Sequence, residues 1–240
     1  MPMAADIRAC IFDVFGTVVD WRNSVSRDLA AFGADKGISG VDWLAFAVAW
    51  RKLYQPAMEE VRSGRRAFTV LDVLHRESLV KLIGEFGITG LSAAEIDHMN
   101  RAWHRLDPWP DAVAGLTRLK SRHVIAPCSN GNIALIVNMA KRAGLPWDCV
   151  LGAETARAYK PMPEAYLAAC RMLDLQPAQV LMVAAHNGDL KAAKAQGLGT
   201  AFVARPTEHG PDQKTDLAAD TSVVDIAADS FVDLAHKLGC

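Results

Sequence analysis

The chain has 240 residues, of which 51% are hydrophobic, so it can bury a sizeable core, and its composition excludes extended disorder. Its 26 basic and 27 acidic residues nearly cancel, which argues against a nucleic acid or a membrane as a partner recruited by bulk charge. Its five cysteines form no CxxC pair and its N-terminus carries no basic segment followed by a long apolar one, so we expect a soluble cytoplasmic protein without a zinc knuckle or a disulfide framework.

The first predicted element is a strand over residues 9–12, where four apolar residues follow one another without alternation and end at Asp13. Such a run is typical of a strand buried on both faces of a parallel sheet. Ligands bind at the carboxyl ends of strands in sheets of this kind, and Gly16 and Thr17 follow in a tight turn. Taken alone, Asp13 is more often a turn former or a helix cap than a nucleophile.

Helical periodicity dominates the next part of the chain. Apolar residues recur at helical spacing in three successive segments, and Ser92 with Glu95 predicts a further helix start by a capping box. The apolar positions are Val25, Leu29 and Phe32, then Leu44, Val48 and Leu53, then Leu71, Leu74, Leu79 and Leu82. No strong strand signal interrupts this stretch, so we predict an all-helical insertion over residues 21–106 within a core made of residues 1–20 and 107–240.

Strands and helices alternate after the prolines at positions 108 and 110. We predict strands over residues 124–128, 149–151, 180–184, 200–203 and 222–224, with helices between them and at the C-terminus. Residues 206–219 are polar and irregular and are expected to form a surface loop. The alternation predicts an α/β fold with a doubly wound parallel sheet.

Polar side chains follow the predicted strands where those strands end. They are Asp13, then Ser129 and Asn130, then Lys160, then His186, Asn187 and Asp189. Each of them alone could be a helix cap or an exposed loop residue. Because the carboxyl ends of parallel strands meet at one edge of the sheet, we expect these side chains to converge, and their recurrence favours a functional site.

Four of these segments resemble the motifs of the haloacid dehalogenase superfamily, in the same order. They are Asp-Val-Phe-Gly-Thr at 13–17, Ser-Asn-Gly at 129–131, Lys-Pro at 160–161 and Asn-Gly-Asp at 187–189. The helical insertion falls where that superfamily carries its cap. The resemblance covers nearly the whole chain and implies a Rossmann-like core with an inserted helical cap domain.

The resemblance also bears on the chemistry, because most members of the superfamily are magnesium phosphatases. Those enzymes carry a second Asp two positions after the nucleophile and an acidic pair in the last motif. This chain has Phe15 and Ala185 at those positions, which can neither donate a proton nor hold Mg²⁺. A halide leaving group needs no proton. The chain therefore resembles the L-2-haloacid dehalogenase branch, which has an aromatic residue at the Phe15 position, and no metal or other cofactor is expected.

For this branch the resemblance implies that Asp13 attacks the α-carbon of a 2-haloalkanoate and expels halide. Water then hydrolyses the resulting ester and frees a 2-hydroxy acid of inverted configuration. Lys160 would keep Asp13 ionised and Thr17 would orient it, while Ser129 and the turn amides near Phe15 would hold the substrate carboxylate.

A cap arginine that follows a tryptophan binds the halide in this branch, and Arg51 after Trp50 matches that position. Asn130 would offer an amide N–H to the same halide. Arg62, Arg65 and Arg66 are competitors, and a surface arginine on an amphipathic helix is the alternative explanation for Arg51. Tyr166 matches a tyrosine that lines the site, although a tyrosine that packs on the sheet explains its position equally well.

The last motif departs from the serine-rich run that many dehalogenases of this branch carry. Asn187 and Asp189 are retained as candidate catalytic groups, but His186 is new in that place. His186 could activate the hydrolytic water, because its ordinary pKa suits that task. It could instead narrow the halide pocket and favour a small halide such as fluoride, or it could be bonded to the backbone.

Two other functions stay open. One is a magnesium-dependent small-molecule phosphatase of the same superfamily, and the other is a non-catalytic binding protein that has kept the fold. A homodimer through Trp43, Leu44 and Phe46 is possible, although these side chains could equally face the core.

Overall fold

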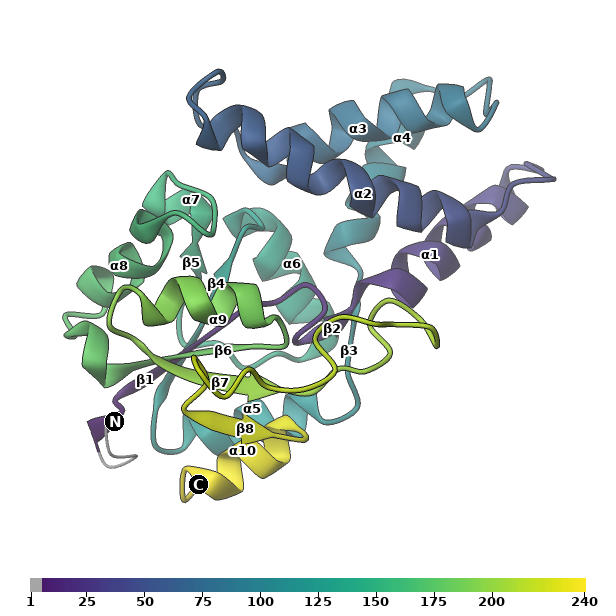
Figure 1. The fold of residues 1–240 in the computed structure, drawn as a ribbon. Coiled ribbons are helices and arrows are strands. Elements are labelled where there is room, and N and C mark those ends of the chain that lie inside the picture. Colours follow the sequence, from purple (N-terminus) through teal and green to yellow (C-terminus); the bar gives the residue numbers. More distant parts are fainter. Residues whose placement is uncertain (1–5) are drawn as a thin grey trace.

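In the computed structural model, which describes residues 6–240, a six-stranded parallel sheet carries helices on both faces, and a cap of further helices stands over the carboxyl ends of its central strands (Figure 1). The strands run in the order β5-β4-β1-β6-β7-β8. They are β1 (Ala9–Phe12), β4 (Val124–Ser129), β5 (Leu151–Gly152), β6 (Val180–Ala184), β7 (Gly199–Val203) and β8 (Ile226–Ala228). The predicted α/β fold with a parallel sheet is confirmed, and β1 lies inside the sheet between β4 and β6.

Helices cover both faces of this sheet, and two of the helices in this part of the chain, α7 and η3, are short. They are α5 (Ala112–Lys120), α6 (Ile133–Ala143), α7 (Ala153–Ala156), α8 (Pro163–Met172), η3 (Pro177–Gln179), α9 (Asn187–Lys194) and α10 (Phe231–Lys237). Cys10 and Phe12 of β1 pack in the core cluster with α5, α6 and α10, whereas Ala9 and Ile11 pack in the cluster with α8 and α9. All four side chains are fully buried, which explains the unbroken apolar run.

The cap consists of helices that the chain forms between the first and second strands of the sheet. They are α1 (Trp21–Asp35), α2 (Trp43–Arg62), α3 (Leu71–Glu85), α4 (Ala93–Asn100) and η2 (Arg101–His104). The chain enters and leaves this cap through one antiparallel ribbon, in which β2 (Val19–Asp20) pairs with β3 (Asp107–Pro108). The ribbon supports the predicted division of the chain near residues 20 and 106, which stays a prediction. The predicted capping box at Ser92 is confirmed.

Helix α2 buries a different face from the one that its aliphatic residues predict. Its buried side chains are Phe46, Ala47, Trp50, Tyr54 and Met58, and Leu44 and Leu53 are only partly buried. The aromatic side chains form the inner face because they pack together and against η2, as Trp50 does with Trp103 at 5.6 Å between ring centroids. Phe46 is therefore buried and does not belong to the surface suggested for a homodimer. The homodimer itself stays a prediction.

One prediction in the C-terminal part was wrong. Residues 222 and 223 lie in a turn because the Asp220 carboxylate accepts hydrogen bonds from the Ser222 backbone and hydroxyl, and the strand forms later, as β8. The predicted loop over residues 206–219 is confirmed and is mostly exposed, although its Glu208 side chain is only 1% exposed. Among residues 6–240, no helix is both long and apolar enough to cross a bilayer.

Candidate active site

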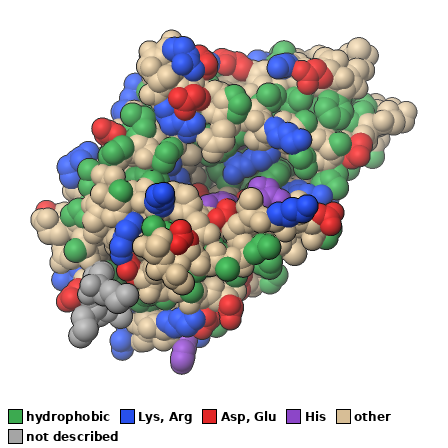
Figure 2. All heavy atoms as spheres, in the orientation of Figure 1, with side chains coloured by type: hydrophobic (Ala, Val, Ile, Leu, Met, Phe, Trp, Pro, Cys, Tyr) green, Lys and Arg blue, Asp and Glu red, His purple; other side chains and the backbone are tan. Residues whose placement is uncertain are grey.

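A cavity of about 820 Å³ lies between the cap and the carboxyl ends of the central strands. Figure 2 shows the molecule hollowed there, with basic and histidine side chains at the edge of the hollow. Helix α2 contributes Arg51, Tyr54, Gln55, Glu59 and Arg62 to the lining. The core contributes Asp13, Asn130, Lys160, Pro161, Met162, His186, Gly188, Asp189, Glu208 and His209.

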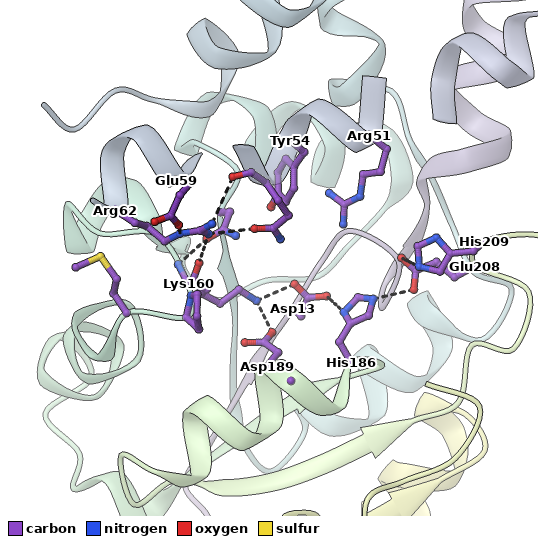
Figure 3. Close-up of a pocket in the computed structure, with 15 residues that line it drawn as sticks. Asp13, Arg51, Tyr54, Glu59, Arg62, Lys160, His186, Asp189, Glu208 and His209 are labelled. Carbon is purple, nitrogen blue, oxygen red and sulfur yellow. Dashed lines mark hydrogen bonds and ion pairs between the residues drawn. The ribbon is translucent and has the colours of Figure 1, made fainter. Parts of the chain in front are cut away.

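Asp13 lies at the floor of this cavity, directly after β1, and only 7% of its surface is exposed. The Lys160 ammonium lies 2.7 Å from Asp13 Oδ1 (Figure 3). The Thr17 hydroxyl donates to Asp13 Oδ2 over 2.7 Å. Thr17 is itself fixed, because its Oγ1 accepts a hydrogen bond from the Ala185 backbone N–H at the end of β6. Asp13 and Lys160 therefore lie together as predicted, and Thr17 makes its predicted contact with Asp13.

Lys160 bridges two carboxylates, since its Nζ also lies 2.5 Å from Asp189 Oδ2. Burial alone would raise the pKa of Asp13, but the charges and hydrogen bonds of Lys160 and His186 outweigh it and hold that pKa well below its usual range. Burial likewise opposes the charge on Lys160, but Asp13 and Asp189 raise the pKa of the ammonium. Asp13 therefore carries its charge throughout the physiological range of pH.

Tyr166 lies behind Asp189 rather than on the cavity wall. Its hydroxyl donates to Asp189 Oδ1 over 2.5 Å, while Lys160 contacts the other oxygen of the same carboxylate. Both oxygens of Asp189 are thus held in place by a donor.

His186 stands between two carboxylates. Its Nδ1 lies 3.2 Å from Asp13 Oδ2, and its Nε2 lies 2.7 Å from Glu208 Oε2 (Figure 3). Burial would lower the pKa of His186, but the hydrogen bonds and charges of Asp13 and Glu208 raise it to about 10. The resting side chain is accordingly an imidazolium that donates to both carboxylates.

Arg51 reaches into the cavity from α2, and its Nη1 is buried without a hydrogen-bond partner among the described residues. Its guanidinium lies over the rings of Tyr54 and Trp21, at 4.1 and 5.4 Å from the centroids. A buried donor with no partner is suited to an anion. The competing arginines are engaged elsewhere: Arg62 donates to the Lys160 carbonyl, Arg65 pairs with Glu60 and Arg66 pairs with Glu77.

Three further predicted residues differ in how they lie relative to the cavity. Asn130 lines the cavity, and its Oδ1 accepts from the Lys160 backbone N–H over 2.9 Å. Ser129 is fully buried, with its hydroxyl accepting from the Gly131 N–H, and Phe15 packs edge-on against Tyr54; neither is among the lining residues.

Asn187 is the clearest correction, because its amide faces away from the cavity. It donates to Asp216 Oδ1 and to the Ala218 carbonyl, and it accepts from the Asp220 N–H. Asn187 therefore anchors the loop segment 216–220 to the start of α9. The predicted catalytic role of Asn187 is wrong.

Sequence reasoning missed Glu208 and His209, which both line the cavity. The irregular composition of residues 206–219 hid them, since no periodicity marks a buried side chain there. One signal was available: the segment begins shortly after β7, whose carboxyl end lies at the same edge of the sheet as those of β1 and β6.

The site does not fit the magnesium ion that the phosphatases of this fold require. Both oxygens of Asp13 already accept from donors: Oδ1 from Lys160, and Oδ2 from Thr17 and His186. The position four residues before Asp189 is the apolar Ala185. No cluster of three or more His, Cys, Asp or Glu side chains that could hold a metal occurs within residues 6–240.

Comparison with known proteins agrees with this geometry. Residues 7–197 match the family of haloacid dehalogenase-like hydrolases. A crystal structure of a defluorinating L-2-haloacid dehalogenase is 50% identical, with a TM-score of 0.94 over 98% of this chain and 96% of that one. A second L-2-haloacid dehalogenase structure is 47% identical, with a TM-score of 0.91 over 97% of this chain and 99% of that one. The (S)-2-haloacid dehalogenase 4A of Burkholderia cepacia is 28% identical over 85% of each chain. The chain therefore belongs to the haloacid dehalogenase-like hydrolase family and, within it, to the L-2-haloacid dehalogenase branch.

Proposed function

We propose that this protein hydrolyses short (S)-2-haloalkanoic acids to 2-hydroxy acids of inverted configuration, through an ester on Asp13 and without a metal ion. The carrying observation is a buried, ionised Asp13 at the floor of the cavity, with Phe15 where a phosphatase has its proton donor. An ionised carboxylate attacks carbon directly, and halide departs without a proton. The names of its 50% and 47% identical relatives support the same substrate class.

The two anions of the reaction, substrate and halide, meet cationic groups on opposite walls. We assign the halide to Arg51, because the unpartnered Nη1 and the surrounding rings form a dry site for a small anion. Asn130 lies across the same cavity and is assigned to the halide as a second donor. Lys160, held by Asp13 and Asp189, supplies the positive charge nearest the reacting carbon.

Water must then attack the ester, and the carboxylate of Asp189 lines the cavity beside Asp13. We assign Asp189 to accept the proton of that water, with Tyr166 holding it in position. Fluoride is included among the expected leaving groups, as the name of the 50% identical relative suggests.

The test is an assay of wild type and Asp13→Asn with 2-chloropropionate, fluoroacetate and p-nitrophenyl phosphate, each with and without EDTA. We expect halide release that resists EDTA in the wild type and a loss of at least about 10⁴-fold in Asp13→Asn, because the nucleophile is removed. Asp174→Asn is the matched control, since Asp174 is exposed and has a φ of 54°, which Asn adopts readily.

Two results would contradict the proposal. Dechlorination by Asp13→Asn at the wild-type rate would remove Asp13 from the reaction. Phosphate release that EDTA abolishes and magnesium restores would identify a phosphatase instead.

A further inference from the structure

Glu208 is a buried carboxylate that the reaction above leaves without a part. It is 1% exposed, its Oε1 accepts from the Trp21 indole N–H over 3.0 Å, and its Oε2 lies 2.7 Å from His186 Nε2. A buried charge is costly unless it is paired, and here both oxygens of the Glu208 carboxylate have a partner. The chain makes room for it at Gly16, where φ is +88° and a Cβ atom would lie 2.0 Å from Glu208 Oε1.

Glu208 is linked to the nucleophile through the imidazole ring. His186 Nδ1 lies 3.2 Å from Asp13 Oδ2, which also accepts from Thr17, whereas Oδ1 accepts only from Lys160 within the described chain. The oxygen with fewer donors is the better nucleophile, so we assign the attack on carbon to Oδ1. Oδ2 then becomes the carbonyl oxygen of the ester, with two donors already aimed at it.

This inference rests on the proposed Asp13 ester. We propose that Glu208 is a positioning residue for the hydrolysis of that ester: its carboxylate holds His186 as an imidazolium, whose Nδ1–H donates to Asp13 Oδ2 while Oδ2 becomes an oxyanion. The oxygen atom of water bonds to Asp13 Cγ, and the carbonyl electron pair moves to Oδ2. The pair then returns, the Cγ–Oδ1 bond breaks, and Oδ1 leaves as the hydroxyl oxygen of the product with the proton that Asp189 accepted from the water. The regenerated carboxyl group of Asp13 releases its proton to solvent.

The charge of Glu208 matters most in this second step. Before alkylation, the imidazolium contacts two anions, Asp13 and Glu208. Alkylation neutralises Asp13, and Glu208 is then the one carboxylate among residues 6–240 that still contacts the ring. Without Glu208, the imidazolium would face a neutral ester in a cavity that also holds Lys160 and Arg51, and it would lose its proton readily.

The other charged groups around His186 reach it through these two carboxylates. Burial would raise the pKa of Glu208, but the hydrogen bond and charge of His186, with smaller effects of Arg51 and His209, lower it. Lys160 and Asp189 lie on the far side of Asp13. Since Asp13 and Glu208 together raise the pKa of His186 to about 10, the imidazolium persists through neutral pH in the resting enzyme. A general base in this position would instead need the unprotonated ring.

The experiment is Glu208→Gln, which keeps an oxygen for the Trp21 N–H and removes the charge. With 2-chloropropionate and enzyme in excess, we expect halide release at the wild-type rate but ester hydrolysis slower by about 100-fold, the usual effect of weakening one oxyanion donor. The ester accumulates on Asp13 and is measured as a mass increase of the intact protein. Glu164→Gln, an exposed substitution at the start of α8, is the matched control and keeps the wild-type rates.

Two further readouts separate positioning from a merely structural part. In His186→Gln, a second change of Glu208→Gln adds no further loss, because Glu208 acts through His186. In the wild type, ester hydrolysis falls as the pH approaches the pKa of His186, and in Glu208→Gln the fall comes at lower pH. The pH profile of the wild type is measured on the unaltered protein, so this readout does not depend on whether a variant folds.

The outcomes distinguish this inference from the proposed function. If the wild type releases no halide and forms no ester, the function itself is wrong. If the ester forms but Glu208→Gln hydrolyses it at the wild-type rate, if the two losses add, or if hydrolysis rises with pH through the titration of His186, the inference is overturned and the function stands.

Discussion

Arg51 differs from Arg62, Arg65 and Arg66, the arginines that compete with it for the halide, by having a buried nitrogen without a partner among the described residues. Its guanidinium is held by aromatic rings, with Tyr54 at 4.1 Å, so its orientation is set without consuming its donors. Arg65, by contrast, is exposed and pairs through two nitrogens with Glu60. The difference between these two side chains provides a direct test of the halide assignment.

We expect Arg51→Lys to weaken inhibition by bromide and chloride by about tenfold or more, since one hydrogen bond to a charged group contributes roughly 1.5–3 kcal/mol. Lysine keeps the charge but loses the planar fork that stacks on the rings. The measurement is the halide inhibition constant, with Arg65→Lys as the control that leaves it unchanged. Equal inhibition constants in wild type and Arg51→Lys would mean that the halide lies elsewhere.

At the scale of the elements, the cap is joined to the core at the start of α3. The Asp72 backbone N–H donates to Asn132 Oδ1 over 3.2 Å, and Asn132 Nδ2 donates back to Asp72 Oδ2 over 2.8 Å. His104 of η2 lies 3.0 Å from the other oxygen of Asp72. One carboxylate thus ties α3, η2 and the residue before α6 together.

We predict that Asp72→Asn lowers the free energy of unfolding by about 1–3 kcal/mol, because the new amide group meets the Asn132 amide or His104 and leaves a donor unpaired. Urea denaturation measures the change. Asp97→Asn is the control, since its exposed pair with Arg76 contributes little. A loss no larger than that of the control would show that this joint does not hold the cap.

The same scale explains what the sequence could reveal. Unbroken apolar runs identify β1, β4 and β6, and the rule that parallel strands end at one edge of the sheet predicts that Asp13 and Lys160 lie together. Helical spacing located α1 and α3 as well. It could not select the buried face of α2, because aromatic packing against η2 competes with the aliphatic stripe. Glu208 escaped because its burial depends on a contact with Trp21, 187 residues away, which leaves no local pattern.

For the whole molecule, the site is complete only when cap and core are assembled. The core supplies the nucleophile and its partners, and α2 supplies the arginine (Figure 3). The cavity brings three cationic groups together with three carboxylates. The cations are Lys160, His186 and Arg51, and the carboxylates are Asp13, Asp189 and Glu208. Their mutual dependence links the stability of the folded chain to pH.

The sign of that link follows from two pKa shifts. The pKa of Asp13 is lower in the folded chain, so its contribution to stability is present above about pH 4 and is lost as the pH falls through the folded value. The pKa of His186 is higher, so its contribution is present below about pH 6.5 and is lost as the pH rises through about 10. We expect His186→Gln to narrow the difference in unfolding free energy between pH 7 and pH 10. An unchanged difference would contradict the ion pairs.

Glu208 fills the space that a side chain at position 16 would need, although the two residues lie near opposite ends of the chain, and this has an evolutionary consequence. A side chain at position 16 would displace the Glu208 carboxylate, so Glu208 can keep its place only while position 16 is glycine. The reverse does not hold, because the positive φ of Gly16 favours glycine there whatever residue stands at position 208. A lineage that acquires the histidine of the last motif without a glycine in the first turn would have no space for the carboxylate that pairs with this histidine.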